Sequence, residues 1–340
     1  MTRFVIFPHL TANAAQRPNP YIADYVQAIN SLPDAKVVNP AHKNPLLSIL
    51  PPSRWGDVYV FNWFESIPDF KYGSLQAVVA ALFLLFLHVR KKKIVWMLHN
   101  KRPHATGHEH MKRFLARLIA RHADLVITHS EEGVKMVADE YPQALDKTHF
   151  LHHPTKCRLT HTESDATPKK YDLLIWGTIA RYKGVFQFAE YIKGHHTTPL
   201  RICIVGGASE TVYAELERLL TPNVTLIRQR PSFEELAAYI AQSEFVLCPY
   251  NPESVLSSGM LMDSLSFGAK VIGPDTGSFR DYAHNPQLRV YTFRLFDAIP
   301  DIVHKHSADK ASPECYREFL ERNTWPHFAQ ALFTLLTQIP

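Results

Sequence analysis

The feature that most constrains this fold is an alternation of short apolar runs with helix-like stretches, repeated in both halves of the chain. In the first half, runs typical of buried strands occupy 4–8, 57–61, 93–98 and 124–128. In the second half they occupy 171–176, 200–205, 223–227, 244–248, 269–273 and 288–292. Because strands covered on both faces are continuously apolar, the alternation predicts an α/β fold of two Rossmann-like, doubly wound parallel sheets.

A polar segment divides the two series. Residues 156–170 hold too few apolar side chains to join a core, so we expect a linker there. The predicted domains are then 1–155 and 171–322, and a length of 340 residues suits two domains. Ligands of such sheets bind beyond the carboxyl ends of the strands, so we expect a site in a cleft between the domains.

The cysteines and the start of the sequence indicate the compartment. The four cysteines lie far apart and form no CxxC pair, which is typical of reduced thiols rather than of a disulfide framework or a zinc knuckle. The first residues run directly into a strand pattern and do not resemble a secretion signal. We therefore expect a cytoplasmic protein.

The first half also combines an apolar run with an excess of positive charge. The unbroken apolar run 77–87 is shorter than the roughly 20 residues that cross a membrane. Between His88 and His122 there are ten Lys and Arg residues and one acid, Glu109. The stretch 110–123 predicts a basic amphipathic helix, in which Lys112, Arg113, Arg117 and Arg121 are interleaved with apolar side chains. Two interpretations stay open for the apolar run: a helix buried in the first domain, or a helix resting on an anionic membrane face.

A nucleic-acid binder would also have such a basic patch. Here, however, the basic residues alternate with aliphatic side chains rather than with aromatic residues that stack on bases. We expect peripheral contact with the inner face of the cell membrane and no nucleic-acid partner.

The loop after the first strand of the second half predicts an anion site. Gly177 and Thr178 end the strand, and Arg181 and Lys183 follow before a helix begins near Gly184. Backbone N–H groups at such a turn, with two cations beside them, suit a diphosphate. The alternative is two exposed basic residues on an ordinary loop.

A second polar loop precedes another helix. Ser257, Ser258 and Gly259 open that helix, where serine is a good N-cap and the helix N-terminus favours phosphate. Asp263 lies about one turn further on, where its carboxylate suits ribose hydroxyls. The alternative for Asp263 is a solvated helix residue.

Together these two loops resemble the C-terminal domain of GT-B glycosyltransferases of family 4. The resemblance implies that Gly177, Arg181, Lys183 and Gly184 hold the diphosphate of a nucleotide-sugar donor. The run 262–272 matches the family's helix and strand, and Asp263 takes the place of its second glutamate, the ribose contact.

The place of the family's first glutamate falls on Val255, and Glu253 lies two residues earlier as a candidate replacement. This departure indicates a divergent branch of the family.

The resemblance extends to the whole architecture and to the reaction. It implies a GT-B fold in which two Rossmann-like domains face a central cleft, with 323–340 as a terminal helix returning to the N-terminal domain. It also implies a hexosyltransferase that takes a UDP-sugar or GDP-sugar and retains the anomeric configuration. Gly206 and Arg230 follow two further strands, where the family frames the nucleotide.

The basic helices of the first domain add an acceptor to this interpretation. We expect a membrane-associated, lipid-linked glycan, as in the synthesis of cell-surface polysaccharides such as capsule or exopolysaccharide. An alternative is a non-catalytic nucleotide-sugar-binding partner of another transferase, which the altered acidic motif favours.

The first domain offers catalytic candidates at two strand ends. His99 resembles the family position that approaches the donor sugar, and imidazole can donate or accept a hydrogen bond near neutral pH. Asn62, Trp63 and Glu65 follow another strand, and Glu65 is a candidate base for an acceptor hydroxyl. The loop 8–21 is expected on the acceptor side.

No metal is expected. The histidines His104, His108 and His110, taken with His99, show no zinc-like ligand spacing. The chain contains no D-x-D triplet, which holds a divalent cation in the other large transferase fold. Arg181, Lys183 and a helix N-terminus would supply the positive charge instead.

Overall fold

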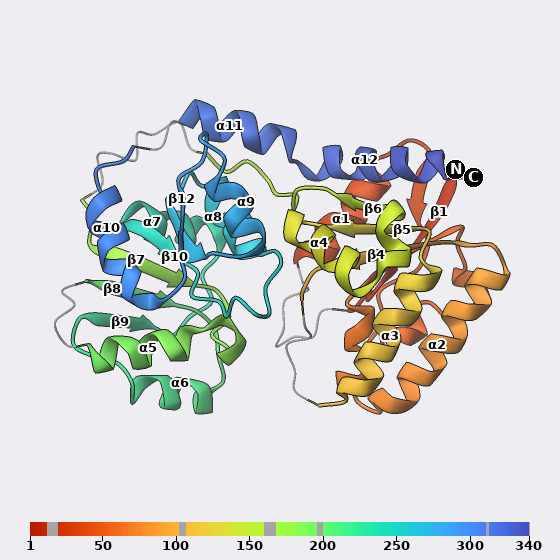
Figure 1. Ribbon diagram of the computed structural model, residues 1–340, viewed down its shortest axis with the longest axis horizontal. Coiled ribbons are helices and arrows are strands. Elements are labelled where there is room, and N and C mark those ends of the chain that lie inside the picture. Colours follow the sequence, from red (N-terminus) through yellow and green to blue (C-terminus); the bar gives the residue numbers. More distant parts are fainter. Residues whose placement is uncertain (12–19, 102–106, 160–167, 196–199, 311–312, 340) are drawn as a thin grey trace. The chain divides into compact units, whose positions relative to one another are not determined.

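The computed structural model describes residues 1–11, 20–101, 107–159, 168–195, 200–310 and 313–339 (Figure 1). The chain divides into two compact units. Unit 1 is Met1–Pro154 with Asn323–Pro340, and unit 2 is Thr155–Arg322. Each unit contains a parallel six-stranded sheet with helices on its faces, which confirms the predicted α/β class and the two Rossmann-like domains.

The sheet of unit 1 has the order β2-β1-β3-β4-β5-β6. Its strands are β1 (Thr2–Phe7), β2 (Ala35–Val37), β3 (Val58–Asn62), β4 (Lys93–Leu98), β5 (Leu125–Thr128) and β6 (Thr148–Phe150). The strands β2 and β6 were not predicted. Each is three residues long, lies at an edge of the sheet and is only partly buried, so neither forms an apolar run.

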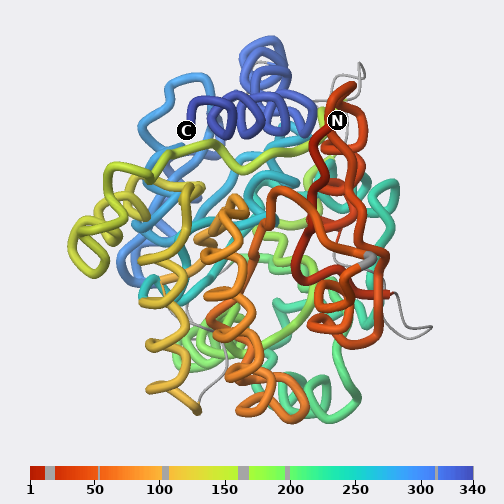
Figure 2. The backbone as a smooth tube through the Cα atoms, turned by 90° about the vertical axis from the view of Figure 1, so that its right-hand side faces the viewer, coloured from red at the N-terminus to blue at the C-terminus, as the bar shows by residue number. Residues whose placement is uncertain are grey.

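Helices cover both faces of this sheet. They are α1 (Pro20–Asn30), α2 (Gly73–Val89), α3 (Glu109–His122), α4 (Glu131–Glu140) and α12 (Trp325–Gln338), with the short 3₁₀ helices η1 (Leu46–Ser48), η2 (Pro52–Arg54), η3 (Phe64–Asp69) and η4 (Pro142–Lys147). Alternate strand residues such as Phe4, Val60 and Val95 pack against α1 and α12. On the other face, α2 and α3 run side by side, as Figure 2 shows in orange and yellow.

The helix α12 joins unit 1 although it comes from the end of the chain. Trp325, Phe328 and Leu332 are buried in the same core as α1. The ammonium group of Lys93, at the start of β4, donates hydrogen bonds to the carbonyls of Leu336 (2.9 Å) and Ile339 (2.7 Å). Because the last carbonyls of a helix lack intrahelical partners, this lysine caps α12 and fastens it to the sheet.

The sheet of unit 2 has the order β12-β11-β10-β7-β8-β9. Its strands are β7 (Tyr171–Trp176), β8 (Ile202–Val205), β9 (Val224–Ile227), β10 (Ser243–Leu247), β11 (Val271–Pro274) and β12 (Val290–Phe293). The chain builds outward from β7 to β9, then returns to place β10 on the other side of β7. The order therefore reverses between β7 and β10, and open α/β sheets bind ligands at such a switch point.

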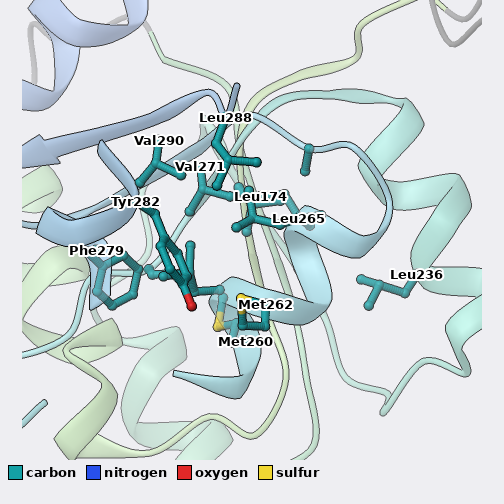
Figure 3. Close-up of a cluster of buried hydrophobic side chains, with 14 of the residues drawn as sticks. Leu174, Leu236, Met260, Met262, Leu265, Val271, Phe279, Tyr282, Leu288 and Val290 are labelled. Atoms are coloured by element: carbon teal, nitrogen blue, oxygen red, sulfur yellow. The ribbon is translucent and has the colours of Figure 1, made fainter. Parts of the chain in front are cut away.

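The helices of unit 2 enclose two apolar cores, one on each face of the sheet. They are α5 (Val185–Gly194), α6 (Glu210–Glu217), α7 (Phe233–Ala241), α8 (Gly259–Ser266), α9 (Gly277–Ala283), α10 (Ile299–His306) and α11 (Pro313–Arg322), with η6 (Arg181–Lys183) and η7 (Phe296–Ala298). Figure 3 shows the core beneath α8 and α9, where Leu174 and Val271 of the sheet meet Leu265, Phe279 and Tyr282.

The apolar run of α2 is buried along one side only. One side, with Ala80, Leu84 and Leu87, is buried against the sheet and α3. The other side exposes an apolar stripe at helical spacing, made of Leu75, Val78, Leu82, Phe86 and Val89. No helix among the described residues is long and apolar enough to cross a membrane.

One residue of the predicted basic face of α3 is placed differently. Lys112 is buried and its ammonium lies 2.8 Å from the Asp69 carboxylate of η3. Lys112 therefore does not contribute to the exposed basic surface of α3, because the Asp69 carboxylate neutralises it beneath the helix. Arg113, Arg117 and Arg121 are exposed, as the amphipathic pattern predicts.

Candidate functional site

The loops that leave β7 and β10 touch each other at the switch point of unit 2. Gly184 has a φ of +73°, and a Cβ atom there would lie 1.7 Å from the carbonyl oxygen of Pro249. Only glycine fits this contact, since any side chain would collide with backbone and the conformation disfavours other residues. The loop 177–184 is therefore held against the segment that follows β10.

Lys183 supplies positive charge at this point. Its Nζ lies 3.5 Å from where a Cβ of Gly177 would be, so the ammonium faces the loop backbone. It makes no ion pair or hydrogen bond with any residue that the structure describes. Burial lowers the pKa of Lys183, and the neighbouring Arg230 cation lowers it further. An unpaired, partly buried cation is costly to the fold unless an anion binds beside it.

A second cation, Arg230, and the glycines that follow β8 lie at the same place. A Cβ at Gly206 would lie 1.9 Å from the Gly177 carbonyl oxygen, so the loops after β7 and β8 are in backbone contact. The Arg230 guanidinium faces Gly207 and donates to Thr178 Oγ1 over 3.4 Å. The structure thus brings together five of the residues singled out in the sequence: Gly177, Thr178, Lys183, Gly206 and Arg230.

Arg181 is not part of this group. Its guanidinium pairs with the Glu215 carboxylate of α6 and lies over the Phe186 ring, 4.8 Å from the centroid. The side chain is 63% exposed. Arg181 would have to leave Glu215 to reach an anion beside Lys183.

The start of α8 lies on the other side of the same contact. Ser258 is the N-cap, and its hydroxyl accepts a hydrogen bond from Leu261 N (3.3 Å) and donates one to the Tyr250 hydroxyl (3.3 Å). Tyr250 follows Pro249, which touches Gly184, so α8 and the Lys183 loop are joined through this segment. Ser257 and Gly259 flank the cap and are partly buried.

Val255, at the place of the family's first glutamate, and its candidate replacement Glu253 lie in different environments. Val255 is 2% exposed and belongs to the apolar core of unit 2, so it is not available to a ligand. Glu253 is exposed on the loop, where its backbone N–H donates to Asn251 Oδ1 over 2.9 Å.

Asp263 is tied to the segment that precedes unit 2's sheet. Its Oδ1 accepts a hydrogen bond from Arg158 Nη1 at 3.0 Å and one from Thr155 Oγ1 at 3.4 Å. The Arg158 guanidinium also lies over the Phe233 ring, 3.9 Å from the centroid. Arg158 was not predicted, because it lies 105 positions from Asp263 and no local pattern joins the two.

In unit 1, His99 lies at the carboxyl end of the sheet. The Trp63 indole is stacked on the imidazole at 4.6 Å between centroids and 24° between planes, and the Tyr21 ring meets it edge-on at 5.0 Å. His99 Nε2 lies 2.9 Å from Asn62 Oδ1. Burial, with a smaller contribution from His153, lowers the pKa of His99 to about 3, so the ring is neutral at physiological pH.

Two further histidines, which were not singled out in the sequence, complete this cluster. His129 follows β5, and its Nε2 lies 3.1 Å from the Tyr21 hydroxyl. His153 follows β6, and its ring lies 5.0 Å from that of His129. Burial lowers the pKa of both. A signal existed, because His129, like His99, directly follows a buried apolar strand.

Glu65 lies in η3 and is 7% exposed. Its carboxyl group faces Trp96 and Asp69 rather than the His99 cluster, and its Oε2 has no hydrogen-bond partner among the described residues. Burial raises the pKa of Glu65 to about 7. The structure therefore gives this carboxyl group a basicity near neutrality but does not bring it to the histidines.

The remaining predictions concern a metal and the loop 8–21. His108 and His110 are exposed at the start of α3, and His104 lies outside the described residues, as do residues 12–19 of the loop. Within the described ranges, no three His, Cys, Asp or Glu side chains lie close enough together to hold a metal ion.

Comparison with known proteins identifies the fold. No family model and no curated sequence matches the chain. Among solved structures, it is similar to Anabaena Alr3699/HepE in complex with UDP and glucose, at 14% identity and a TM-score of 0.67 over 99% of this chain and 100% of that one. It is also similar to the lipopolysaccharide outer core galactosyltransferase WaaB, at 12% identity and a TM-score of 0.61 over 99% of each chain.

A third similar structure is a glycosyltransferase from Rickettsia africae, at 10% identity and a TM-score of 0.60 over 99% of this chain and 98% of that one. At such low identities the similarity establishes the fold. The chain has the two-domain GT-B fold of glycosyltransferases.

Proposed function

We propose that this protein is a metal-independent, retaining hexosyltransferase that takes a UDP- or GDP-linked sugar as donor. The observation that carries the proposal is the ammonium of Lys183, which has no ion-pair partner in the described part of the chain and lies beside Arg230 and the backbone of Gly177, at the switch point of unit 2. The GT-B fold supports it, since the similar HepE structures are complexes with UDP, with UDP-glucose, and with UDP and glucose.

The chemistry follows from the charges. When the bond between the sugar and the diphosphate breaks, negative charge grows on the leaving phosphate oxygens. Lys183, Arg230, the backbone N–H groups near Gly177 and Thr178, and the start of α8 at Ser257–Gly259 would stabilise that charge. Arg181 would add to it after leaving Glu215. No divalent cation is needed, because two side-chain cations and a helix N-terminus take its place.

The remaining predicted residues would act around this centre. Asp263 would release Arg158 and bind ribose hydroxyls in its place. Gly206 would let the nucleotide approach the backbone that follows β8. Glu253 is an exposed acid two positions before Val255 and is the candidate replacement for the missing acid. His99 would contact the sugar, and Glu65 is retained as a candidate base only if η3 rearranges.

For the acceptor, we propose a membrane-associated, lipid-linked glycan of cell-surface polysaccharide synthesis, reached from the inner face of the membrane. The apolar stripe of α2 supports this, as does a cavity of about 550 Å³ beside it, lined by Ala77, Val78, His108, Glu109, His110, Met111 and Phe114. Arg90, Lys91 and Lys92 follow the stripe, and exposed apolar residues flanked by cations suit an anionic bilayer surface.

The donor half of the proposal is tested by the melting temperature in the presence of nucleotide sugars. A bound donor raises Tm by mass action. We expect UDP- or GDP-sugars to raise it and Lys183→Ala to abolish the rise, whereas Lys193→Ala, an exposed lysine of the same unit, leaves it unchanged. The absence of a rise with every UDP- and GDP-sugar tested would refute the donor assignment.

Transfer or hydrolysis of the bound donor separates the enzyme from the alternative. The burial of Val255, where the family has an acid, favours a non-catalytic nucleotide-sugar-binding partner as the second candidate. Such a protein would show the Tm rise but neither hydrolyse nor transfer the donor at any enzyme concentration.

The membrane half is tested by flotation with liposomes. Anionic vesicles should carry the protein upward, and Leu82→Glu should reduce that fraction. Leu295→Glu changes a similarly exposed leucine of unit 2 and serves as the matched control. If both variants floated equally, or if the wild-type protein did not float, the proposed membrane contact through α2 would be refuted.

A further inference from the structure

The hydrogen bonds of Asn62 determine which nitrogen of His99 is protonated. Asn62 Nδ2 donates to the carbonyl oxygen of Phe7 at 3.0 Å, and a carbonyl oxygen can only accept. This fixes the orientation of the amide and leaves its Oδ1 facing His99 Nε2 at 2.9 Å. Because Oδ1 also can only accept, the hydrogen of the imidazole is on Nε2.

The other ring nitrogen of His99 is therefore an acceptor. The ring is buried and neutral, so Nδ1 has a lone pair and no hydrogen. No hydrogen bond joins Nδ1 to any residue that the structure describes. The ring cannot flip freely, because Trp63 is stacked on it and Tyr21 packs edge-on.

The neighbouring histidines have the opposite arrangement. His129 Nδ1 lies 2.8 Å from the carbonyl oxygen of Leu151, and His153 Nδ1 lies 2.9 Å from that of Pro154. Both must donate through Nδ1, so His129 Nε2 accepts from the Tyr21 hydroxyl. His99 differs from both in its tautomer, and Asn62 is the residue that makes the difference.

We propose that Asn62 is a positioning residue, which holds His99 in the Nε2–H tautomer so that Nδ1 is left to accept a hydrogen bond from a hydroxyl of a sugar ligand. The identity of that ligand rests on the proposed function, whereas the tautomer does not. In this state His99 is neither a cation nor a proton donor through Nδ1. It therefore favours a ligand that presents a hydroxyl to Nδ1 over one that presents a carboxylate, which has no hydrogen to donate at neutral pH.

Nitrogen NMR of the ¹⁵N-labelled protein tests the tautomer without any substrate. Protonated and unprotonated imidazole nitrogens have well-separated shifts, and a His99→Gln variant assigns the resonances. We expect wild-type His99 to be the Nε2–H form, Asn62→Ala to give a mixture, and Asn62→Asp, which keeps an acceptor oxygen, to retain Nε2–H. A wild-type ring protonated on Nδ1, or an Asn62→Ala ring unchanged from wild type, would overturn the proposal.

A double-mutant cycle tests the consequence for the reaction. Asn62→Ala should lower kcat/KM about tenfold, the size expected for the loss of one hydrogen bond, and should have little further effect in a His99→Ala background. Equal losses in both backgrounds would mean that Asn62 acts on the fold and not through His99, which refutes the proposal. Absence of transferase activity in the wild type refutes the proposed function instead, and the NMR result is independent of it.

Discussion

The two units have similar sheets but different chemistry at the carboxyl ends of their strands. In unit 1 those ends hold neutral imidazoles and aromatic rings, with His99, His129 and His153 after successive strands. In unit 2 they hold glycines and cations, with Lys183 and Arg230 beside Gly177. The fold supplies a place for a ligand, and the residues after each strand decide which ligand that place suits.

Burial of titratable groups has different consequences in the two units. An imidazole can lose its proton, so burial in unit 1 gives neutral histidines at a moderate cost. Lys183 of unit 2 is partly buried without a counter-ion among the described residues, and this burial lowers its pKa. Under the proposed function, the neutral imidazoles of unit 1 would accept hydrogen bonds from hydroxyls, and an anion bound to unit 2 would offset the cost of burying the Lys183 ammonium.

Among the variants that test this contrast, Lys183→Ala should have the largest effect on activity. Transfer should fall by about 10²- to 10³-fold, as when a single charge-stabilising group is removed from an active site. The Tm of the free protein should stay the same or rise, because an uncompensated cation is removed. The measurements are steady-state rates and calorimetry, with Lys193→Ala as control. A variant that loses stability but keeps the rate would contradict the role given to Lys183.

Acidification should weaken unit 1 before unit 2. The folded-state pKa values of His99 and His153 are about 3 and about 4, below their ordinary value of 6.5. Below pH 6.5 the unfolded chain binds protons that these folded histidines do not, so their contribution to stability is complete above 6.5 and falls as the pH approaches 4. Hydrogen exchange between pH 7 and 4.5 measures the local stability of each unit. If unit 2 opened at a higher pH than unit 1, the prediction would be wrong.

Glu65→Gln should stabilise the protein at alkaline pH. The folded-state pKa of Glu65 is about 7, raised from 4.5 by burial. A carboxyl group of this kind favours folding while it is protonated and ceases to do so as the pH rises through 7. We expect a gain of about 1 to 3 kcal/mol in the free energy of unfolding at pH 8 and little change at pH 5. Denaturant unfolding of the wild type and the variant at both pH values measures this gain. An equal gain at pH 5 and pH 8 would contradict a buried carboxyl group that is neutral below pH 7.

Glu215→Ala should have the smallest effect on stability. The Arg181–Glu215 pair is exposed, so its loss should cost about 0 to 1 kcal/mol. Freed from Glu215, Arg181 should strengthen donor binding several-fold, and Arg181→Ala should weaken it. Calorimetric titration with the donor measures both. If neither variant changes the affinity, Arg181 remains outside the site, and the cations of unit 2 that matter reduce to Lys183 and Arg230.

The sheets were predictable because their central strands are covered on both faces and are therefore apolar throughout. The runs 93–98 and 171–176 coincide with β4 and β7, whereas the three-residue edge strands β2 and β6 left no such pattern. The glycines and cations that follow β7 were predictable for a related reason, since a strand end is visible in the sequence and parallel strands bring their carboxyl ends to one edge.

The buried strands and the residues that follow them can be located from the sequence alone, and with them the two-domain α/β fold. The tertiary structure decided the partners of those residues. Arg181 with Glu215, Asp263 with Arg158, and His99 with Asn62 are pairs separated by 34, 105 and 37 positions. No local period connects positions so far apart, and a hydrogen bond depends on tenths of an ångström that are set only when the elements pack.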